Sequence, residues 1–320
     1  MRKSLLARFA PLALALCLLS AHSAAAGERL TVLLDWYVNP DHAPLYVALE
    51  NGMFAKRGLD VELVAPANPN DPPKLVAAGK ADVAISYQYQ HQVQVEQGLP
   101  LTRIATLIAT PLNCLVVSAD SGIDSPAALK GKKIGYSVGG FETTLLQVIL
   151  KEAGLGLDDV QLVNVNFSLA PALLSGRVDA VVGAFRNFEL NQMRLQGRPG
   201  RAFLVEEHGV PLYDELIFVA ARDRVGAPRL RLFVDALEEA AHFLVNHPEQ
   251  SWQLFIAGRP ELDDELNRLA WRDTLPRFAL RPGALDSARY LRFAEFLRRE
   301  KMVASVPPLA AWAVELPALP

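Results

Sequence analysis

A pattern that occurs twice along the chain constrains its fold more than any other feature of the sequence. Leu75-Val-Ala-Ala-Gly79-Lys-Ala-Asp82 and Ala172-Leu-Leu-Ser-Gly176-Arg-Val-Asp179 both indicate the end of a helix, a glycine stop, an aspartate and then a buried strand. The strands before them, at 58–63 and 157–162, also match in order. Short periods are typical of solenoids, but this one is about the length of a small domain. The sequence therefore predicts two similar α/β units.

Strand and helix signals alternate on both sides of these copies, which favours the α/β class. A chain of 320 residues also exceeds what one hydrophobic core usually supports, so we expect two lobes. After Arg222 the pattern changes to four amphipathic helices, which we expect to pack back on the first lobe. The expected strands are 30–34, 61–64, 83–86, 101–110, 115–118, 133–136, 160–165 and 180–182, and the expected helices are 43–54, 71–78, 87–97, 142–153, 185–195, 230–246, 248–257, 262–278 and 285–300.

Residues 1–26 have the pattern of a cleaved secretory signal peptide. Positive charges at Arg2, Lys3 and Arg8 precede an apolar run, and Ala24-Ala25-Ala26 supplies small residues for cleavage before Gly27. The apolar run is too short for a transmembrane helix. We therefore expect a soluble, periplasmic mature protein that retains Cys114 as its single cysteine and has no internal disulfide.

Charge and motifs argue against several classes of function. The formal net charge is −3 and basic residues do not cluster, which disfavours nucleic-acid binding. The sequence has no Gly-x-x-x-x-Gly-Lys loop, no Gly-x-Ser-x-Gly motif and no Cys or His pair with metal-ligand spacing. We therefore expect no catalytic residue, no metal site and no cofactor.

The first candidate site follows the buried strand at 30–34. The chain breaks there into Asp35-Trp36-Tyr37-Val38-Asn39-Pro40-Asp41-His42 before a helix begins. In open α/β sheets, ligands bind where strands end in this way. Trp36, Asn39 and His42 are therefore candidate ligand contacts. The alternative is that the aromatic residues belong to the core and that His42 caps the helix.

Two further candidates also follow strands. Gly139 and Gly140, with Phe141, form a turn that presents free N–H groups at the start of a helix, which suits an anion, although a plain tight turn explains them equally well. Phe185 and Glu189 would share one face of a helix at 185–195, placing an apolar ring beside a carboxylate. Asn166, at the end of the strand before, is a further candidate for the same site. A surface salt bridge of Glu189 is the alternative.

Five segments together resemble the periplasmic solute-binding proteins of ABC importers, in particular the group that binds sulfonates and thiamine precursors. These segments are LDWYVNPDHAPLYVA, NPNDPPKLVAAGKADVAISYQ, IGYSVGGFE, VNVNFSLAPALLSGRVDAVVGAFRNFELNQM and PLYDELIFVA. The resemblance is strongest to the binding proteins for formylaminopyrimidine and hydroxymethylpyrimidine. It implies a type II periplasmic-binding fold with a ligand cleft. The chain would cross between lobes near 111–116 and 210–216, so that 27–115 plus 213–320 form lobe 1 and 116–212 form lobe 2.

The resemblance also implies a ligand and partners. A 4-amino-2-methylpyrimidine would stack on Trp36 and on a second ring, which is Tyr87, Phe185 or Tyr213. Glu189 would accept a hydrogen bond from the exocyclic amine, and Asn39 and Asn187 would reach the ring substituent. The partners would be the permease and ATPase subunits of an importer, and the protein itself would be a monomer.

Two alternative functions stay open at the level of sequence. The same family contains enzymes that synthesise the thiamine pyrimidine from pyridoxal phosphate, and these carry a cysteine-rich run before a late strand. The corresponding segment here, 210–217, has no cysteine, which argues against synthesis. A sulfonate-type or taurine-type ligand is the second alternative, because the Gly139-Gly140 turn offers N–H groups to an anion. Hydroxymethyl and formylaminomethyl pyrimidines are not distinguished.

Overall fold

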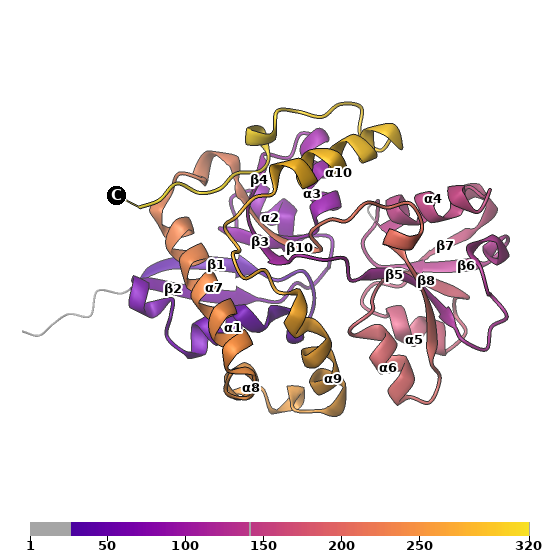
Figure 1. Cartoon of the computed structure of the whole chain (residues 1–320), viewed down its shortest axis with the longest axis horizontal. Coiled ribbons are helices and arrows are strands. Elements are labelled where there is room, and N and C mark those ends of the chain that lie inside the picture. Colours follow the sequence, from indigo (N-terminus) through magenta and orange to yellow (C-terminus); the bar gives the residue numbers. More distant parts are fainter. Residues whose placement is uncertain (1–26, 141, 320) are drawn as a thin grey trace, which may run out of the picture.

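The computed structural model describes residues 27–140 and 142–319, and its strands form two separate sheets (Figure 1). The first sheet has the order β2-β1-β3-β10-β4, and the second has the order β7-β6-β8-β5-β9. The strands are β1 (Glu28–Leu33), β2 (Leu59–Val64), β3 (Val83–Ser86), β4 (Leu101–Ile108), β5 (Asn113–Ser118), β6 (Lys133–Tyr136), β7 (Gln161–Asn164), β8 (Ala180–Phe185), β9 (Gly200–Leu204) and β10 (Leu216–Ala221). We call the parts built on these sheets the first and the second lobe.

The two sheets share one topology. In each, three parallel strands are followed by one antiparallel strand and an edge strand, and the antiparallel strand is the one that arrives from the other lobe. This strand is β10 in the first sheet and β5 in the second. The chain therefore crosses twice, between β4 and β5 and between β9 and β10.

The repeated sequence pattern has a physical cause that the structure makes visible. Asp82 precedes β3, and its carboxylate accepts the N–H of Thr31 in β1 at 2.9 Å. Asp179 precedes β8, and its carboxylate accepts the N–H of Lys133 in β6 at 2.8 Å. Each aspartate thus aligns the start of one strand with its parallel neighbour. The expectation of two similar α/β units is confirmed at this level.

The helices cover both sheets. They are α1 (Ala43–Glu50), α2 (Pro72–Ala77), α3 (Gln88–Glu96), α4 (Glu142–Glu152), α5 (Leu169–Leu174), α6 (Glu189–Leu195), α7 (Pro228–Asn246), α8 (Pro248–Ile256), α9 (Glu265–Thr274) and α10 (Ser287–Arg299). As expected, α7 and α8 pack on α1, and α10 packs on α3. The exception is α9, which also contacts α6 of the second lobe (Figure 1).

One carboxylate joins the two crossing segments. Glu215 lies immediately before β10, and its Oε2 accepts the backbone N–H groups of Leu112 at 2.6 Å and Asn113 at 2.8 Å. The same oxygen accepts the hydroxyl of Tyr213 at 2.9 Å. The predicted crossings at 111–116 and 210–216 overlap these segments, although the predicted boundary after residue 115 falls inside β5. The division into lobes at these residue numbers stays a prediction.

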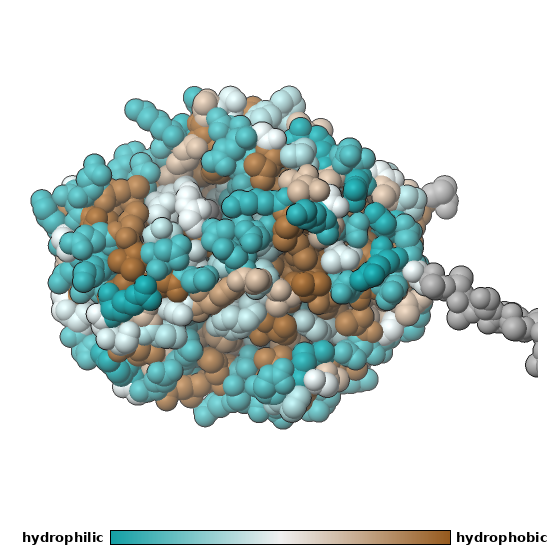
Figure 2. Space-filling view, turned by 180° about the vertical axis from the view of Figure 1, so that it is seen from behind, coloured by the Kyte–Doolittle hydropathy of each residue, from teal (hydrophilic) through white to brown (hydrophobic). Residues whose placement is uncertain are grey.

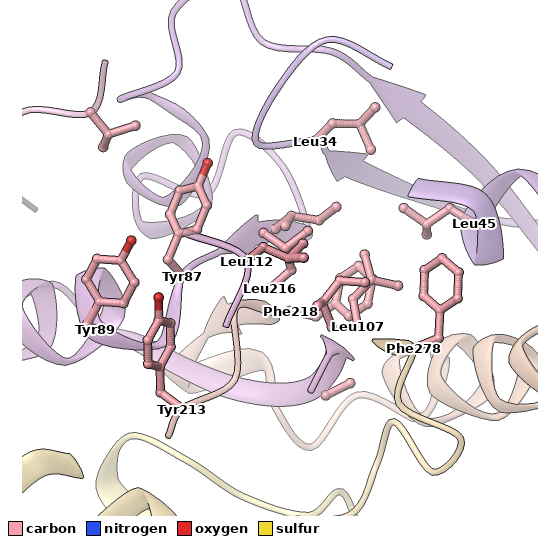
Figure 3. Close-up of a cluster of buried hydrophobic side chains, with 14 of the residues drawn as sticks. Leu34, Leu45, Tyr87, Tyr89, Leu107, Leu112, Tyr213, Leu216, Phe218 and Phe278 are labelled. Atoms are coloured by element: carbon pink, nitrogen blue, oxygen red, sulfur yellow. The ribbon is translucent and has the colours of Figure 1, made fainter. Parts of the chain in front are cut away.

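A large hydrophobic cluster runs beneath the first sheet and across the crossing (Figure 3). Tyr87, Tyr89 and Tyr213 lie together on one side of it, and aliphatic and phenyl side chains such as Leu45 and Phe278 fill the other. The face of the molecule in Figure 2 is mainly hydrophilic, with separate hydrophobic patches. Within residues 27–140 and 142–319, no helix combines the length and the apolar character needed to cross a membrane. The predicted signal peptide, 1–26, lies outside the described residues.

Candidate functional site

A cavity lies between the lobes at the carboxyl ends of β1, β3 and β8. Its empty space is about 430 Å³ when the open solvent at its mouth is included. Both lobes contribute side chains to it, as the α/β architecture favours. Its lining consists of Asp35, Trp36, Asn39, Asp41, Tyr87, Asn113, Glu142, Leu169, Gly183, Phe185, Phe188 and Glu189.

The segment after β1 is fixed by its own hydrogen bonds. Asp35 binds His42 Nε2 at 2.9 Å and accepts the hydroxyl of Tyr87 at 2.9 Å. Asn39 caps the turn at Pro40–His42, because its Oδ1 accepts the N–H of Asp41 at 2.8 Å. His42 is fully buried and contributes to this cap rather than to the cavity wall. His42 thus has the capping role that was the alternative to ligand contact, and it lies behind Asp35.

Aromatic rings from both lobes surround the cavity. The ring of Tyr87 meets that of Phe185 edge to face, with 6.3 Å between centroids. At the mouth, Trp36 of the first lobe contacts Phe167 of the second, with centroids 4.6 Å apart. Phe188 also lines the cavity, beside Tyr37. Of the three rings considered as partners of Trp36, Tyr87 and Phe185 line the cavity, whereas Tyr213 is buried against Glu215.

Glu189 lines the cavity, but the local structure that places it there differs from the helix predicted from its sequence spacing. The predicted helix at 185–195 is wrong in its first turn, because Phe185 ends β8 and the helix α6 begins at Glu189. The two residues still meet, since Glu189 Oε2 accepts the backbone N–H of Phe185 at 2.7 Å. Burial in the cavity wall raises the pKa of Glu189 to about 7.

A second carboxyl group, Glu142, is a cavity residue that the sequence did not identify. It begins α4, and its Oε2 accepts the N–H of Ser137 at 2.6 Å. Gly183, with φ of +96°, makes room for it, because a Cβ at that position would overlap the Glu142 carboxyl. Burial raises the pKa of Glu142 to about 8. The strand-to-helix turn before Glu142 did indicate a site, but the sequence analysis assigned the ligand contact to its glycines and not to Glu142.

Several predicted site residues lie away from the cavity. Gly139 and Gly140 line a separate groove, in which Gly139 donates its N–H to Asn70 at 2.9 Å. Asn166 is exposed and has a left-handed backbone, with φ of 50°. Asn187 is buried beside the cavity and donates to Asp41 at 2.6 Å. Phe141 lies outside the described residues.

The cavity is acidic. Asp35, Asp41, Glu142 and Glu189 line it, and none of its described lining residues is a lysine or an arginine. Burial also raises the pKa of Asp41, to about 6. Such a site favours a cation or a ligand rich in hydrogen-bond donors, because carboxylates so placed disfavour a further negative charge. Among residues 27–140 and 142–319, no cluster of three or more His, Cys, Asp or Glu residues is arranged to hold a metal ion.

Comparison with known sequences finds a family model described as "NMT1/THI5 like", which matches residues 39–251. A protein of Haemophilus influenzae named as a thiamine biosynthesis protein is 51% identical over 91% of this chain and 93% of its own length. The formylaminopyrimidine-binding protein of Halalkalibacterium halodurans is 35% identical, over 73% of this chain and 72% of its own. A 4-amino-5-hydroxymethyl-2-methylpyrimidine phosphate synthase of Saccharomyces cerevisiae is 27% identical, over 75% and 74% respectively.

Solved structures show the same architecture at low sequence identity. The alkanesulfonate-binding protein of Xanthomonas axonopodis pv. citri superimposes with a TM-score of 0.71, at 17% identity, over 91% of this chain and 100% of its own. A Candida albicans protein described as having the generic periplasmic-binding-protein fold gives a TM-score of 0.67, at 16% identity, over 91% and 96%. The predicted periplasmic-binding fold is thereby confirmed.

Proposed function

We propose, given that the chain belongs to the NMT1/THI5-like family, that it binds a 4-amino-2-methylpyrimidine precursor of thiamine and delivers it to an ABC importer. The resemblance recognised in its sequence is confirmed by the family match and by the named relatives. These relatives are named for thiamine biosynthesis, for formylaminopyrimidine binding and for pyrimidine phosphate synthesis. The identity of the ligand and the role in import belong to the proposal.

The observation that carries the proposal is the combination of rings and carboxyl groups around one cavity. A pyrimidine is flat, and Trp36, Tyr87 and Phe185 offer faces and edges to it, with ring contacts that contribute about 0.5–1.5 kcal/mol beyond burial. Its exocyclic amine and any protonated ring nitrogen are donors. Glu189, which already accepts the N–H of Phe185, is placed to accept from them with its second oxygen.

A sulfonate fits this cavity poorly. The anion would meet four carboxyl groups and none of the arginine or lysine side chains that commonly bind it. The Gly139-Gly140 turn, whose N–H groups made a sulfonate attractive in the sequence, lies in a separate groove. The solved sulfonate-binding structure shares the fold with this chain, and the chemistry of the cavity favours a different ligand.

Three observations favour binding rather than synthesis. The segment before β10, which is cysteine-rich in the synthases, reads Val210-Pro-Leu-Tyr-Asp-Glu here. Cys114, the single cysteine among the described residues, is fully buried, and burial raises the pKa of its thiol. The relatives at higher identity include one named for pyrimidine binding, whereas the synthases are more distant.

Delivery to an importer requires export and two lobes that move. The leader pattern at 1–26 supports a periplasmic location, and the partners would be a permease and an ATPase subunit. We assign residues 27–115 and 213–320 to lobe 1 and residues 116–212 to lobe 2, and we expect a monomer that closes on its ligand as hinged binding proteins do.

Calorimetric titration of 4-amino-5-hydroxymethyl-2-methylpyrimidine into the purified protein tests the proposal. Glu189→Gln and Trp36→Ala should each weaken binding by roughly ten- to a hundredfold, through a lost charged hydrogen bond and a lost ring contact. Glu261→Gln, which removes the same charge at an exposed position, is the matched control. The proposal is wrong if an alkanesulfonate binds and the pyrimidine does not, or if folded Glu189→Gln binds the pyrimidine as tightly as wild type.

A further inference from the structure

The cavity has more carboxyl groups in its wall than an aminopyrimidine ring needs. One carboxyl group is enough to accept from the amine edge, and Glu189 supplies it in the function proposed above. Glu142 is a second one, 3% exposed, on a different helix. Its carboxyl group is held in one place, because it occupies the space where Gly183 lacks a side chain and because one of its oxygens accepts the N–H of Ser137. The ionised form of such an acid, in a cavity wall without a basic partner, is costly unless a ligand meets it.

Both acids contact residues near the end of the strand β8. Glu142 lies against Gly183, and Glu189 is bound to the N–H of Phe185. The pairing of β8 with β5 shifts register between Val182 and Ala184, so the two contacts lie at different positions along an irregular part of the strand. A ligand ring that uses Glu189 for its amine edge would therefore extend a short substituent towards Glu142. In this arrangement Glu189 would contact the amine edge of the ligand, and Glu142 would contact the substituent.

Charge decides what kind of substituent suits that end of the cavity. The described lining contains four carboxyl groups and no lysine or arginine, and aromatic rings complete the wall. Rings and carboxylates are the two kinds of group that bind an organic ammonium ion in proteins. A hydroxyl or a formyl oxygen at that place offers the carboxyl groups no positive charge, whereas an ammonium ion does.

We infer that Glu142 is a specificity residue that selects pyrimidines with a protonated amine on the C5 substituent over those with a hydroxyl or a formylamino group. The inference rests on the proposed function, because it takes Glu189 as the partner of the amine edge. It identifies the class of ligand as a cationic 4-amino-5-aminomethylpyrimidine.

Three 4-amino-2-methylpyrimidines, with aminomethyl, hydroxymethyl and formylaminomethyl groups at C5, are titrated into wild type, Glu142→Gln and the exposed control Glu261→Gln. The aminomethyl compound should bind wild type at least about tenfold more tightly than the others. Glu142→Gln should weaken it by roughly ten- to a hundredfold and change the hydroxymethyl compound by less than about threefold. Glu261→Gln should match wild type for all three.

A second measurement needs only the wild type and serves if Glu142→Gln does not fold. Burial holds the pKa of Glu142 at about 8, so at pH 7 its carboxyl is mostly protonated before binding. Pairing with an ammonium ion ionises it, so the aminomethyl compound should release up to about one more proton than the hydroxymethyl compound. Calorimetry in two buffers with different ionisation enthalpies measures that difference.

The outcomes separate the inference from the function on which it rests. If no pyrimidine binds wild type, the proposed function fails and the inference fails with it. If the hydroxymethyl compound binds but the aminomethyl compound binds no tighter, the inference alone is overturned. Equal weakening of all three ligands by Glu142→Gln, or equal proton release for the two compounds, also overturns it.

Discussion

The side-chain amide of Asn187, in the second lobe, donates to Asp41 Oδ1, in the first lobe, at 2.6 Å. The same amide donates to Thr274 Oγ1 at 2.7 Å, and the hydroxyl of Thr274 lies 2.9 Å from Asp41. A further bond joins the lobes, because the side-chain amide of Asn191 in α6 donates to Asp273 in α9 at 2.8 Å. These bonds join the lobes beside the cavity, so we expect them to stabilise a closed form.

Removing this bond should weaken ligand binding without touching the ligand. Asn187→Ala leaves Asp41 with fewer donors and reduces the population of the closed form, which lowers the apparent affinity by the same factor. We expect a loss of roughly ten- to a hundredfold in calorimetry and a larger radius of gyration in solution scattering. Asn246→Ala, at an exposed amide on α7, is the control. Unchanged affinity in folded Asn187→Ala would show that the bond does not govern closure.

Asp41 should make stability depend on pH. Burial raises its folded-state pKa to about 6, above the ordinary aspartate value of 3.8. A carboxyl with a raised pKa contributes its stability fully below the unfolded value and loses it as pH rises through the folded value. Wild type should therefore lose up to about 3 kcal/mol relative to Asp41→Asn between pH 4 and pH 8. Urea unfolding of both proteins measures this difference, and the opposite slope would mean that the donors around Asp41 outweigh its burial.

Gly183 should be far less replaceable than an ordinary turn glycine. Alanine at Gly183 adopts a disfavoured positive φ and also overlaps the Glu142 carboxyl. Gly122, with φ of +72° and open space around it, carries the backbone cost alone. We expect Gly122→Ala to lose about 1–2 kcal/mol of unfolding free energy, and Gly183→Ala about 1–3 kcal/mol more. In a Glu142→Ala background the excess should vanish, and additive losses would exclude the overlap as its cause.

Trp36 should report ligand binding by its fluorescence. The other three tryptophans, Trp252, Trp271 and Trp312, are buried in the first lobe, whereas Trp36 lies at the cavity mouth against Phe167. A ligand that stacks on this ring changes its surroundings. Addition of the pyrimidine should shift the emission of wild type, and Trp36→Phe should abolish the shift while keeping a ring in place. A shift that persists in Trp36→Phe would place the ligand elsewhere.

The sequence predicted the architecture well because strand and helix signals are local. The strands at 83–86 and 133–136 occur with the predicted bounds, and the duplicated pattern corresponds to two sheets of one topology. The helix at 185–195 was wrong at its start because Gly183, Ala184 and Phe185 continue the strand, a choice that pairing with β5 makes and that local signals do not contain.

The site was harder to predict because it depends on contacts between distant segments. Trp36 and Glu189 were found since each follows a strand. The partner of Asn187 is Asp41, which is distant in the sequence, so the sequence analysis assigned Asn187 to the ligand instead. Tyr213 binds the nearby Glu215, but the burial of this pair against the segment at 112–113 depends on the fold. Glu142 was missed for a related reason, because the space that it occupies is created by Gly183.

The position of Glu215 has a consequence for replacing the second lobe by protein engineering. By holding Leu112 and Asn113 beside the start of β10, it brings the entry and the exit of the second lobe to one point of the first. The intervening segment is therefore an insertion with adjacent ends. A different module of similar size, such as a fluorescent reporter or the ligand-reading lobe of a relative, can be spliced in at these two positions without stretching the first sheet.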